Sequence, residues 1–151
     1  MIKIICIGKL KEKPLIDLEN IYIKRLNKYT KLEIIELLSD DDKDINKAIN
    51  KEKEKILKVL KPNDNIVILD INGLSKSSIE FSKFINDEIA YKSNITFIIG
   101  SSNGLASEIK TLSNKHISFS KMTFPHQMFR IMLLEQIYRA FKIINNETYH
   151  K

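Results

Sequence analysis

Short apolar runs alternate along the chain with longer amphipathic segments. The runs are rich in Ile, Val and Leu and are predicted to form buried β-strands. They lie at residues 2–7, 32–38, 65–71, 94–99 and 116–119. Three of the runs are apolar on both faces of the strand, which is typical of a parallel sheet covered by helices on both sides.

The segments between the runs carry apolar residues at helical spacing. In the first of them Leu15, Leu18 and Ile21 recur at intervals of three or four residues, and Pro14 suits a first helical turn. Asn72-Gly73 is predicted to be a turn. The predicted helices cover residues 14–26, 45–60, 78–90, 105–112 and 125–144. Because strands and helices alternate throughout, we expect one α/β domain over residues 1–151, with a mostly parallel sheet and helices on both faces.

The last predicted helix is apolar around most of its circumference. Its polar residues Glu135, Arg139 and Lys142 form one narrow stripe. A sheet covers only one side of a helix, so a second apolar partner is expected. That partner is predicted to be another copy of the chain, which makes a homodimer through the C-terminal helix. The alternative is a central helix enclosed within one subunit.

Composition narrows the class of protein. The chain has 151 residues, of which 43% are hydrophobic, the size and composition of one folded domain. Its one cysteine, Cys6, lies in an apolar strand, where a small buried hydrophobe is expected. A lone cysteine fits a reducing cytoplasm, and residues 1–4 lack the anatomy of a signal peptide. No apolar run approaches the roughly 20 residues of a membrane span, so no membrane partner is expected.

The net charge of +6 is concentrated at the two ends of the chain. Residues 1–31 hold eight Lys and Arg against three acidic residues, and residues 115–151 hold six against two. This distribution indicates a polyanionic partner such as a nucleic acid. The alternative is an ordinary solvated lysine surface.

Two loops and the chain end are candidates for chemistry. Gly100–Gly104 joins a buried strand to a helix, the place where α/β sheets bind ligands, although a plain structural turn is about as probable from the sequence. A polar loop, Phe119–Gln127, opens the last helix. The three histidines, at 116, 126 and 150, lack metal-ligand spacing, so no metal is expected. A chain ending on Tyr149-His150-Lys151 suggests that its terminus is used.

The chain resembles the bacterial 23S rRNA pseudouridine N3-methyltransferases, small members of the SPOUT class. The likeness includes Ile7–Lys13 and Leu69–Ile71, and it is densest in Ser118–Met128, before Glu135–Phe141 and the Tyr-His-Lys end. It implies a C-terminal trefoil knot, a homodimer, and S-adenosylmethionine as methyl donor. The donor contacts that it implies are Leu69, Gly100, Gly104, Phe119, Ser120, Lys121, Met122, Thr123 and Phe124. The family usually has a second glycine where this chain has Ser101, which leaves the local backbone conformation open.

The reaction that the resemblance implies moves a methyl group to N3 of a pseudouridine in 23S rRNA, with the ribosome as partner. Tyr149, His150 and Arg139 are the expected catalytic residues, because the N3 proton must leave or its charge must be stabilised. The expected RNA contacts are Lys9, Lys11, Lys13, Lys24, Arg25 and Lys151. The alternatives are a non-enzymatic ribosome-binding factor with the same fold and a SPOUT methyltransferase with another RNA target.

Overall fold

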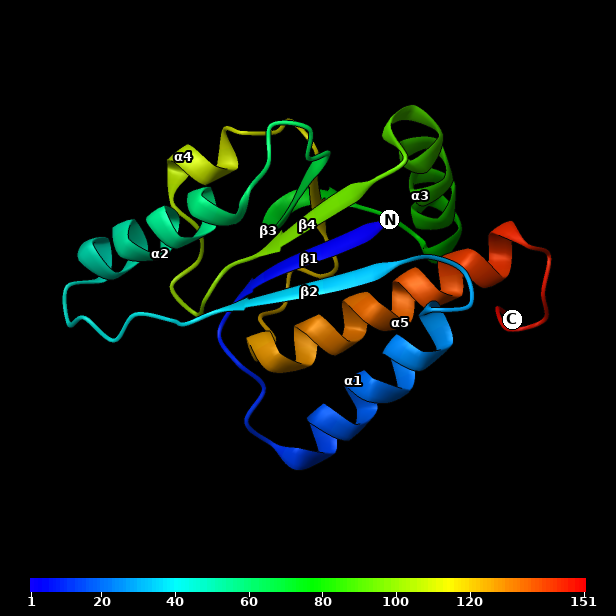
Figure 1. Ribbon diagram of the computed structural model, residues 1–151, viewed down its shortest axis with the longest axis horizontal. Coiled ribbons are helices and arrows are strands. Elements are labelled where there is room, and N and C mark those ends of the chain that lie inside the picture. Colours follow the sequence, from blue (N-terminus) through cyan, green and yellow to red (C-terminus); the bar gives the residue numbers. More distant parts are fainter.

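Five parallel strands form a single twisted sheet in the computed structural model, which describes residues 1–151 (Figure 1). The order of the strands is β2-β1-β4-β3-β5. In chain order the elements are β1 (Ile2–Ile7), α1 (Lys13–Leu26), β2 (Leu32–Leu37), α2 (Ile45–Val59), β3 (Ile66–Ser75), α3 (Ser78–Lys92), β4 (Ile95–Ile99), α4 (Ser107–Lys110), β5 (His116–Ser118) and α5 (His126–Ile144). The predicted α/β class and the parallel sheet are confirmed.

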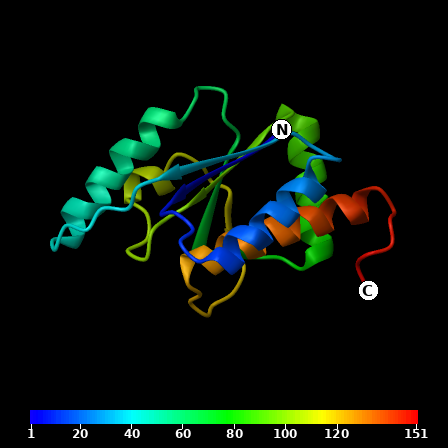
Figure 2. The ribbon, with the colours of Figure 1, turned by 60° about the horizontal axis from the view of Figure 1, so that its bottom comes forward.

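Helices cover both faces of the sheet, as predicted. Alternate side chains of β1 separate the two cores: Ile4 packs in a cluster with α1, α3 and α5, and Ile5 packs in a cluster with α2 and α4. Figure 2 shows α2 apart from the pair formed by α1 and α5. The central strands β1 and β4 are buried along their whole length, which explains their continuous apolar sequence.

Polar residues at the helix starts set the boundaries of α2 and α3. The Asp44 carboxylate accepts hydrogen bonds from the amides of Asn46 and Lys47, at 3.0 and 3.3 Å. Ser77 and Glu80 form a capping box, in which each side chain accepts a hydrogen bond from the other residue's amide. Such caps satisfy amides that have no partner inside the helix.

The predicted turn at Asn72-Gly73 is wrong, because β3 continues through it to Ser75. The strand shifts register between Leu69 and Leu74, and both of these residues pair with Ile117 of β5. At Gly73 a Cβ atom would lie 2.6 Å from the Ile117 amide nitrogen. Glycine here therefore permits the close approach of another backbone within an irregular strand.

The last helix is mostly enclosed within the chain. α5 lies between α1 and α3 on one face of the sheet (Figure 1), and Met128 is its one large hydrophobic residue that is exposed. One subunit thus supplies both helices that flank α5, and the predicted homodimer stays a prediction. α4 also differs from its prediction, since it spans only Ser107–Lys110. None of the helices is long and apolar enough to cross a membrane.

Candidate active site

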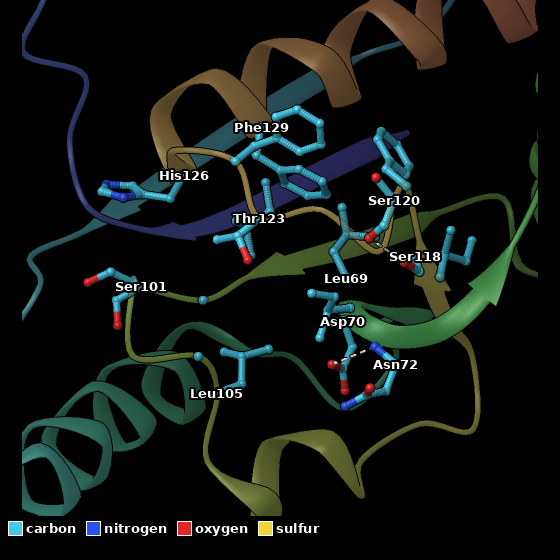
Figure 3. Close-up of a pocket in the computed structure, with 18 of the residues that line it drawn as sticks. Leu69, Asp70, Asn72, Ser101, Leu105, Ser118, Ser120, Thr123, His126 and Phe129 are labelled. Atoms are coloured by element: carbon cyan, nitrogen blue, oxygen red, sulfur yellow. Dashed lines mark hydrogen bonds between the residues drawn. The ribbon is translucent and has the colours of Figure 1, made fainter.

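A cavity of about 310 Å³ opens where β4 and β5 end, beside the middle of β3 (Figure 3). This volume lies at the lower end of the range for small-molecule sites. The carboxyl edge of a parallel sheet is where such folds bind ligands. The residues that line the cavity come from β3, the end of β4 with the loop after it, α4, β5 with the loop that follows it, and the start of α5. They are Leu69, Asp70, Ile71, Asn72, Ile99, Gly100, Ser101, Ser102, Gly104, Leu105, Lys110, Ile117, Ser118, Phe119, Ser120, Met122, Thr123, Phe124, His126 and Phe129.

The loop after β4 is a tight turn that brings backbone to the cavity wall. The Gly104 amide donates to the Ser101 carbonyl at 2.9 Å, and Gly104 has a positive φ of 84°. A Cβ atom at Gly100 would lie 2.8 Å from the Gly104 carbonyl oxygen. Ser101 is not among the residues with positive φ, so a serine fits here without backbone strain. The loop predicted as a ligand site is thus part of the cavity.

The loop before α5 is held in place by aromatic packing. The Phe119 ring lies 5.8 Å from that of Phe81 and 5.1 Å from that of Phe129, measured between centroids. The Ser120 hydroxyl accepts a hydrogen bond from the Met122 amide at 3.0 Å. Loops are in general more mobile than helices and strands, and these contacts give this loop a defined shape at the cavity wall.

A carboxylate stands on the β3 side of the cavity. Asp70 accepts a hydrogen bond from the Asn72 amide at 3.2 Å and lies 3.0 Å from the Lys110 ammonium (Figure 3). His116 Nδ1 is 3.6 Å away. Burial acts to raise the pKa of Asp70, but the hydrogen bonds from Lys110 and Asn72 outweigh it and hold the pKa below its ordinary value. The cavity therefore carries a stable negative charge beside a lysine.

The start of α5 joins the cavity to the basic N-terminal loop. His126 lines the cavity, and a Cβ atom at Gly8 would come within 2.7 Å of its Nε2. The next residue, Gln127, accepts a hydrogen bond from the Lys11 amide at 3.0 Å. Gly8 has a φ of 105°, a conformation that favours glycine. The segment that carries Lys9, Lys11 and Lys13 therefore leaves β1 directly beside the cavity.

The C-terminal residues fold back on α5 and lie away from this cavity. The Tyr149 ring packs on that of Tyr138, 5.0 Å between centroids, and its hydroxyl donates to Glu135 at 3.2 Å. The Arg139 guanidinium lies 4.7 Å from the Tyr149 ring centre, and its Nη1 is 3.3 Å from His150 Nδ1. Arg139 sits about 15 Å beyond the cavity residue Phe129, at roughly 1.5 Å per residue of helix. The three predicted catalytic residues are thus together, but they do not line the cavity of their own chain.

Two charge states in this cluster are set by Glu135. The hydrogen bond from Arg139 to Glu135 raises the pKa of the guanidinium, which stays charged. Burial, with the nearby Glu135 carboxylate, raises the pKa of Tyr149 to about 12. Tyr149 is therefore a neutral hydrogen-bond donor at physiological pH and is unsuited to act as a general base there.

The predicted RNA contacts divide into two groups. Lys9, Lys11 and Lys13 lie in or next to the loop after β1. Lys24 and Arg25 lie at the other end of α1, about 16 Å away along the helix. Arg25 stacks on the rings of Tyr22 and Tyr138, 5.6 Å from each centre, so it belongs with the C-terminal cluster. Lys151, the sixth predicted contact, is exposed and follows His150 of that cluster.

All but one of the predicted donor contacts line the cavity; Lys121 is exposed and is not among its lining residues. The sequence reasoning missed Asp70, Lys110 and Phe129 as lining residues. Asp70 had a usable signal, since it is a carboxylate near the end of a buried strand. Lys110 had none, because its approach to Asp70 depends on where α4 packs.

The fold and the cavity define a ligand-binding α/β protein with its site at the carboxyl edge of a parallel sheet. Residues 1–150 match the family model described as "Predicted SPOUT methyltransferase". The chain therefore belongs to the SPOUT methyltransferase family, which confirms the resemblance found in its sequence.

Individual relatives match over nearly their full length. A protein of Clostridium tetani named ribosomal RNA large subunit methyltransferase H is 52% identical, with 99% of each chain covered. A protein of the same name from Caldicellulosiruptor saccharolyticus is 46% identical, with 100% of each chain covered. One from Methanococcus maripaludis, named as a putative member of that group, is 50% identical over 99% of each chain.

Proposed function

We propose that the protein uses S-adenosylmethionine to methylate N3 of a pseudouridine in 23S rRNA, acting in the cytoplasm on the ribosome. One observation carries the proposal. The segments to which the resemblance assigns the donor, around Leu69, Gly100 and Phe119–Phe124, come together around one cavity of about 310 Å³. The names of the full-length relatives support a target in the large ribosomal subunit.

The cavity suits the methyl donor. S-adenosylmethionine has a flat apolar base and a charged amino-acid end, and its sulfonium supplies an activated methyl group when bound. Leu69, Leu105 and Phe129 offer apolar surface, whereas Asp70 and Ser118 offer polar groups. A Cβ atom at Gly104 would meet nothing within 4 Å, so this glycine leaves open space beside the backbone of the turn.

The C-terminal cluster has the groups that the nucleotide side of the reaction needs. N3 of pseudouridine carries a weakly acidic proton, and His150 is the proposed acceptor, since a neutral imidazole nitrogen can accept a proton. Arg139 holds a permanent positive charge for a phosphate or for the developing imide anion. Tyr149 donates a hydrogen bond or stacks on the base. Deleting residues 149–151 is expected to abolish methylation and to leave donor binding largely intact.

We propose that these residues serve the cavity of a second subunit in a homodimer, because they lie too far along α5 to serve their own. Mixed dimers test this. One subunit lacks residues 149–151, and the other carries Gly100→Val to block its donor cavity. If the tail acts across the dimer, the mixed dimer regains activity while both parent homodimers stay inactive. An inactive mixed dimer that still binds donor contradicts the proposal.

The knot is a further part of the proposal. Ile117 of β5 pairs with both Leu69 and Leu74, so β3 is irregular where it pairs with the strand that leads towards α5. The Ser78 hydroxyl at the start of α3 also donates to Gln136 of α5 at 2.8 Å. These contacts bring the C-terminal segment beside β3 and the start of α3, which supports the knot that the family resemblance implies, in which that segment threads through an earlier loop.

The proposed RNA surface is the lysine group beside the cavity. The logarithm of the binding constant for RNA falls linearly with the logarithm of the salt concentration. Each phosphate contact that is lost should make this slope less steep by about 0.7–0.9. Replacing Lys9, Lys11 and Lys13 by Ala should weaken ribosome binding and flatten its salt dependence. The triple variant Lys43→Ala, Lys47→Ala and Lys58→Ala, at exposed lysines in or just before α2, is the matched control. Equal effects of both sets would mean that only the overall charge matters.

The deciding experiment incubates the protein with labelled donor and ribosomes from a strain that lacks the enzyme, then maps the modified nucleotide. Label on a pseudouridine of 23S rRNA is the expected result. Label elsewhere would indicate another RNA target. Calorimetry with S-adenosylmethionine tests the remaining alternative, a ribosome-binding factor without turnover, which need not bind the donor.

A further inference from the structure

A buried carboxylate from α2 contacts the loop that follows β4. Glu52 is only 3% exposed. One of its carboxylate oxygens accepts a hydrogen bond from the Ser101 hydroxyl at 2.8 Å, and the other accepts one from the Asp40 amide at 3.0 Å. Glu52 forms no ion pair: the lysines around it pair with Asp40, Asp42, Glu54 and Glu108.

A buried carboxylate without a cation is costly, because two neutral donors replace only part of its hydration. Ordinary packing would be served as well by an apolar side chain on this face of α2, where Ala48 and Ile56 are also buried. The presence of Glu52 here is therefore better explained by the hydrogen bonds that it accepts from Ser101 and Asp40 than by the stability of the helix.

Ser101 connects Glu52 to the donor cavity, because it is hydrogen-bonded to Glu52 and also lines the cavity. Its hydroxyl also accepts a hydrogen bond from the Asn103 amide at 3.3 Å, and its carbonyl accepts one from Gly104. The turn therefore has its hydroxyl fixed on the outer side by α2 while its backbone forms the cavity wall (Figure 3). A free turn with glycines at both ends would sample many conformations.

We infer that Glu52 is a positioning residue for donor binding, and that Ser101, where the family usually has glycine, is the residue through which it acts. The pair holds the Gly100–Gly104 turn in the shape that receives the methyl donor. This inference rests on the proposed function and adds a helix outside the cavity to the binding machinery. Its physical basis is that a ligand binds more weakly when the competent conformation is less populated.

The test measures S-adenosylmethionine binding by calorimetry with the full-length protein, together with thermal unfolding. Ser101→Ala should raise the Kd roughly tenfold, the expected scale for one hydrogen bond to a charged group. Ser107→Ala, which removes an exposed hydroxyl that donates to the Glu108 carboxylate outside the cavity, is the matched control and should change the Kd less than about twofold. In methylation assays Ser101→Ala should raise the KM for the donor and leave kcat nearly unchanged.

Substitutions at Glu52 separate positioning from a plain structural role. Glu52→Gln should bind donor nearly as wild type, because its carbonyl can accept from the Asp40 amide while its amide donates to Ser101. Glu52→Ala should weaken binding at least as much as Ser101→Ala, and the double variant should be no weaker than Glu52→Ala alone.

Unchanged donor binding in Ser101→Ala would overturn the inference, whatever happens to the melting temperature. Equal losses in Glu52→Gln and Glu52→Ala would also overturn it. If the wild-type protein itself fails to bind S-adenosylmethionine, the proposed function fails first. Normal binding in wild type and in every variant refutes the positioning role alone.

Discussion

Replacing Arg130 should cost more stability than any other single charge removal on α5. Arg130 is 3% exposed, and its guanidinium pairs with two carboxylates, Glu19 at 2.6 Å and Glu36 at 2.9 Å. It also lies 3.0 Å from the Cys6 sulfur. Arg130→Met keeps most of the volume and leaves two carboxylates facing each other without a cation. Removing one partner of a buried ion pair typically costs about 3–5 kcal/mol.

For a chain of this length, that cost corresponds to a fall in melting temperature of roughly 6–20 °C. Circular dichroism during thermal and urea unfolding measures it. The matched control is Arg139→Met on the same helix, whose ion pair with Glu135 is partly exposed and should be worth no more than about 1 kcal/mol. Similar losses in the two variants would refute the reasoning, because burial would then not decide the energy.

The loss of stability in Arg130→Met should also depend on pH. Burial raises the pKa of Glu19 above its ordinary value even with Arg130 beside it, and removing the arginine raises that pKa further. A carboxyl group whose pKa is higher in the folded state than in the unfolded state gains stability as the pH falls through the folded value. The deficit of Arg130→Met should therefore shrink between pH 7 and pH 5. A deficit that grows on acidification would contradict the assignment.

Three further outcomes are expected. Gly73→Ala places a Cβ atom 2.6 Å from the Ile117 nitrogen and should destabilise the protein by about 2–4 kcal/mol in urea unfolding, whereas unchanged stability would mean that the β3–β5 contact is loose. Gly100→Ala should reduce donor affinity at least tenfold in calorimetry, because its Cβ atom would displace the turn, and wild-type affinity would exclude that turn from the site. Tyr149→Phe should leave the pH profile of kcat below pH 10 unchanged in shape, since the pKa of Tyr149 is about 12, and a rise of kcat with pH that disappears in the variant would make the tyrosine a base after all.

Most of the element pattern was predictable because it depends on local spacing. The apolar runs become the five strands, and the periodic segments become the helices, with end shifts of a few residues. The exception at Asn72-Gly73 is instructive. Gly73 was interpreted as a turn residue, but it is a glycine within a strand, made necessary by a β5 backbone more than forty positions away in the chain. No local rule contains that contact.

The candidate site was predicted in part for the same reason. Gly100–Gly104 and Phe119–Phe124 follow strands, so their place at the carboxyl edge follows from the parallel sheet alone. The tail residues Tyr149 and His150 were predicted to be catalytic, and the structure places them away from the cavity of their own chain, so their action at a second subunit's cavity stays a proposal. The aromatic and charged side chains of the tail pack on Tyr138 and Glu135, a contact that depends on how the chain turns after α5.

The sequence by itself determined the strands, the helices, the parallel class of the sheet and the loops at its ligand edge, because hydrophobic spacing and turn residues act over a few positions. Only the tertiary structure decided which distant side chains meet. The apolar pattern of the last helix did not predict a role for Arg130, whereas the structure pairs it with Glu19 and Glu36. In the sequence Ser101 is only a serine where the family usually has glycine, whereas in the structure its hydroxyl donates a hydrogen bond to Glu52. Pairings of this kind depend on the packing of α1, α2 and α5 against the sheet, and hydrophobic burial selects that packing over the whole molecule at once.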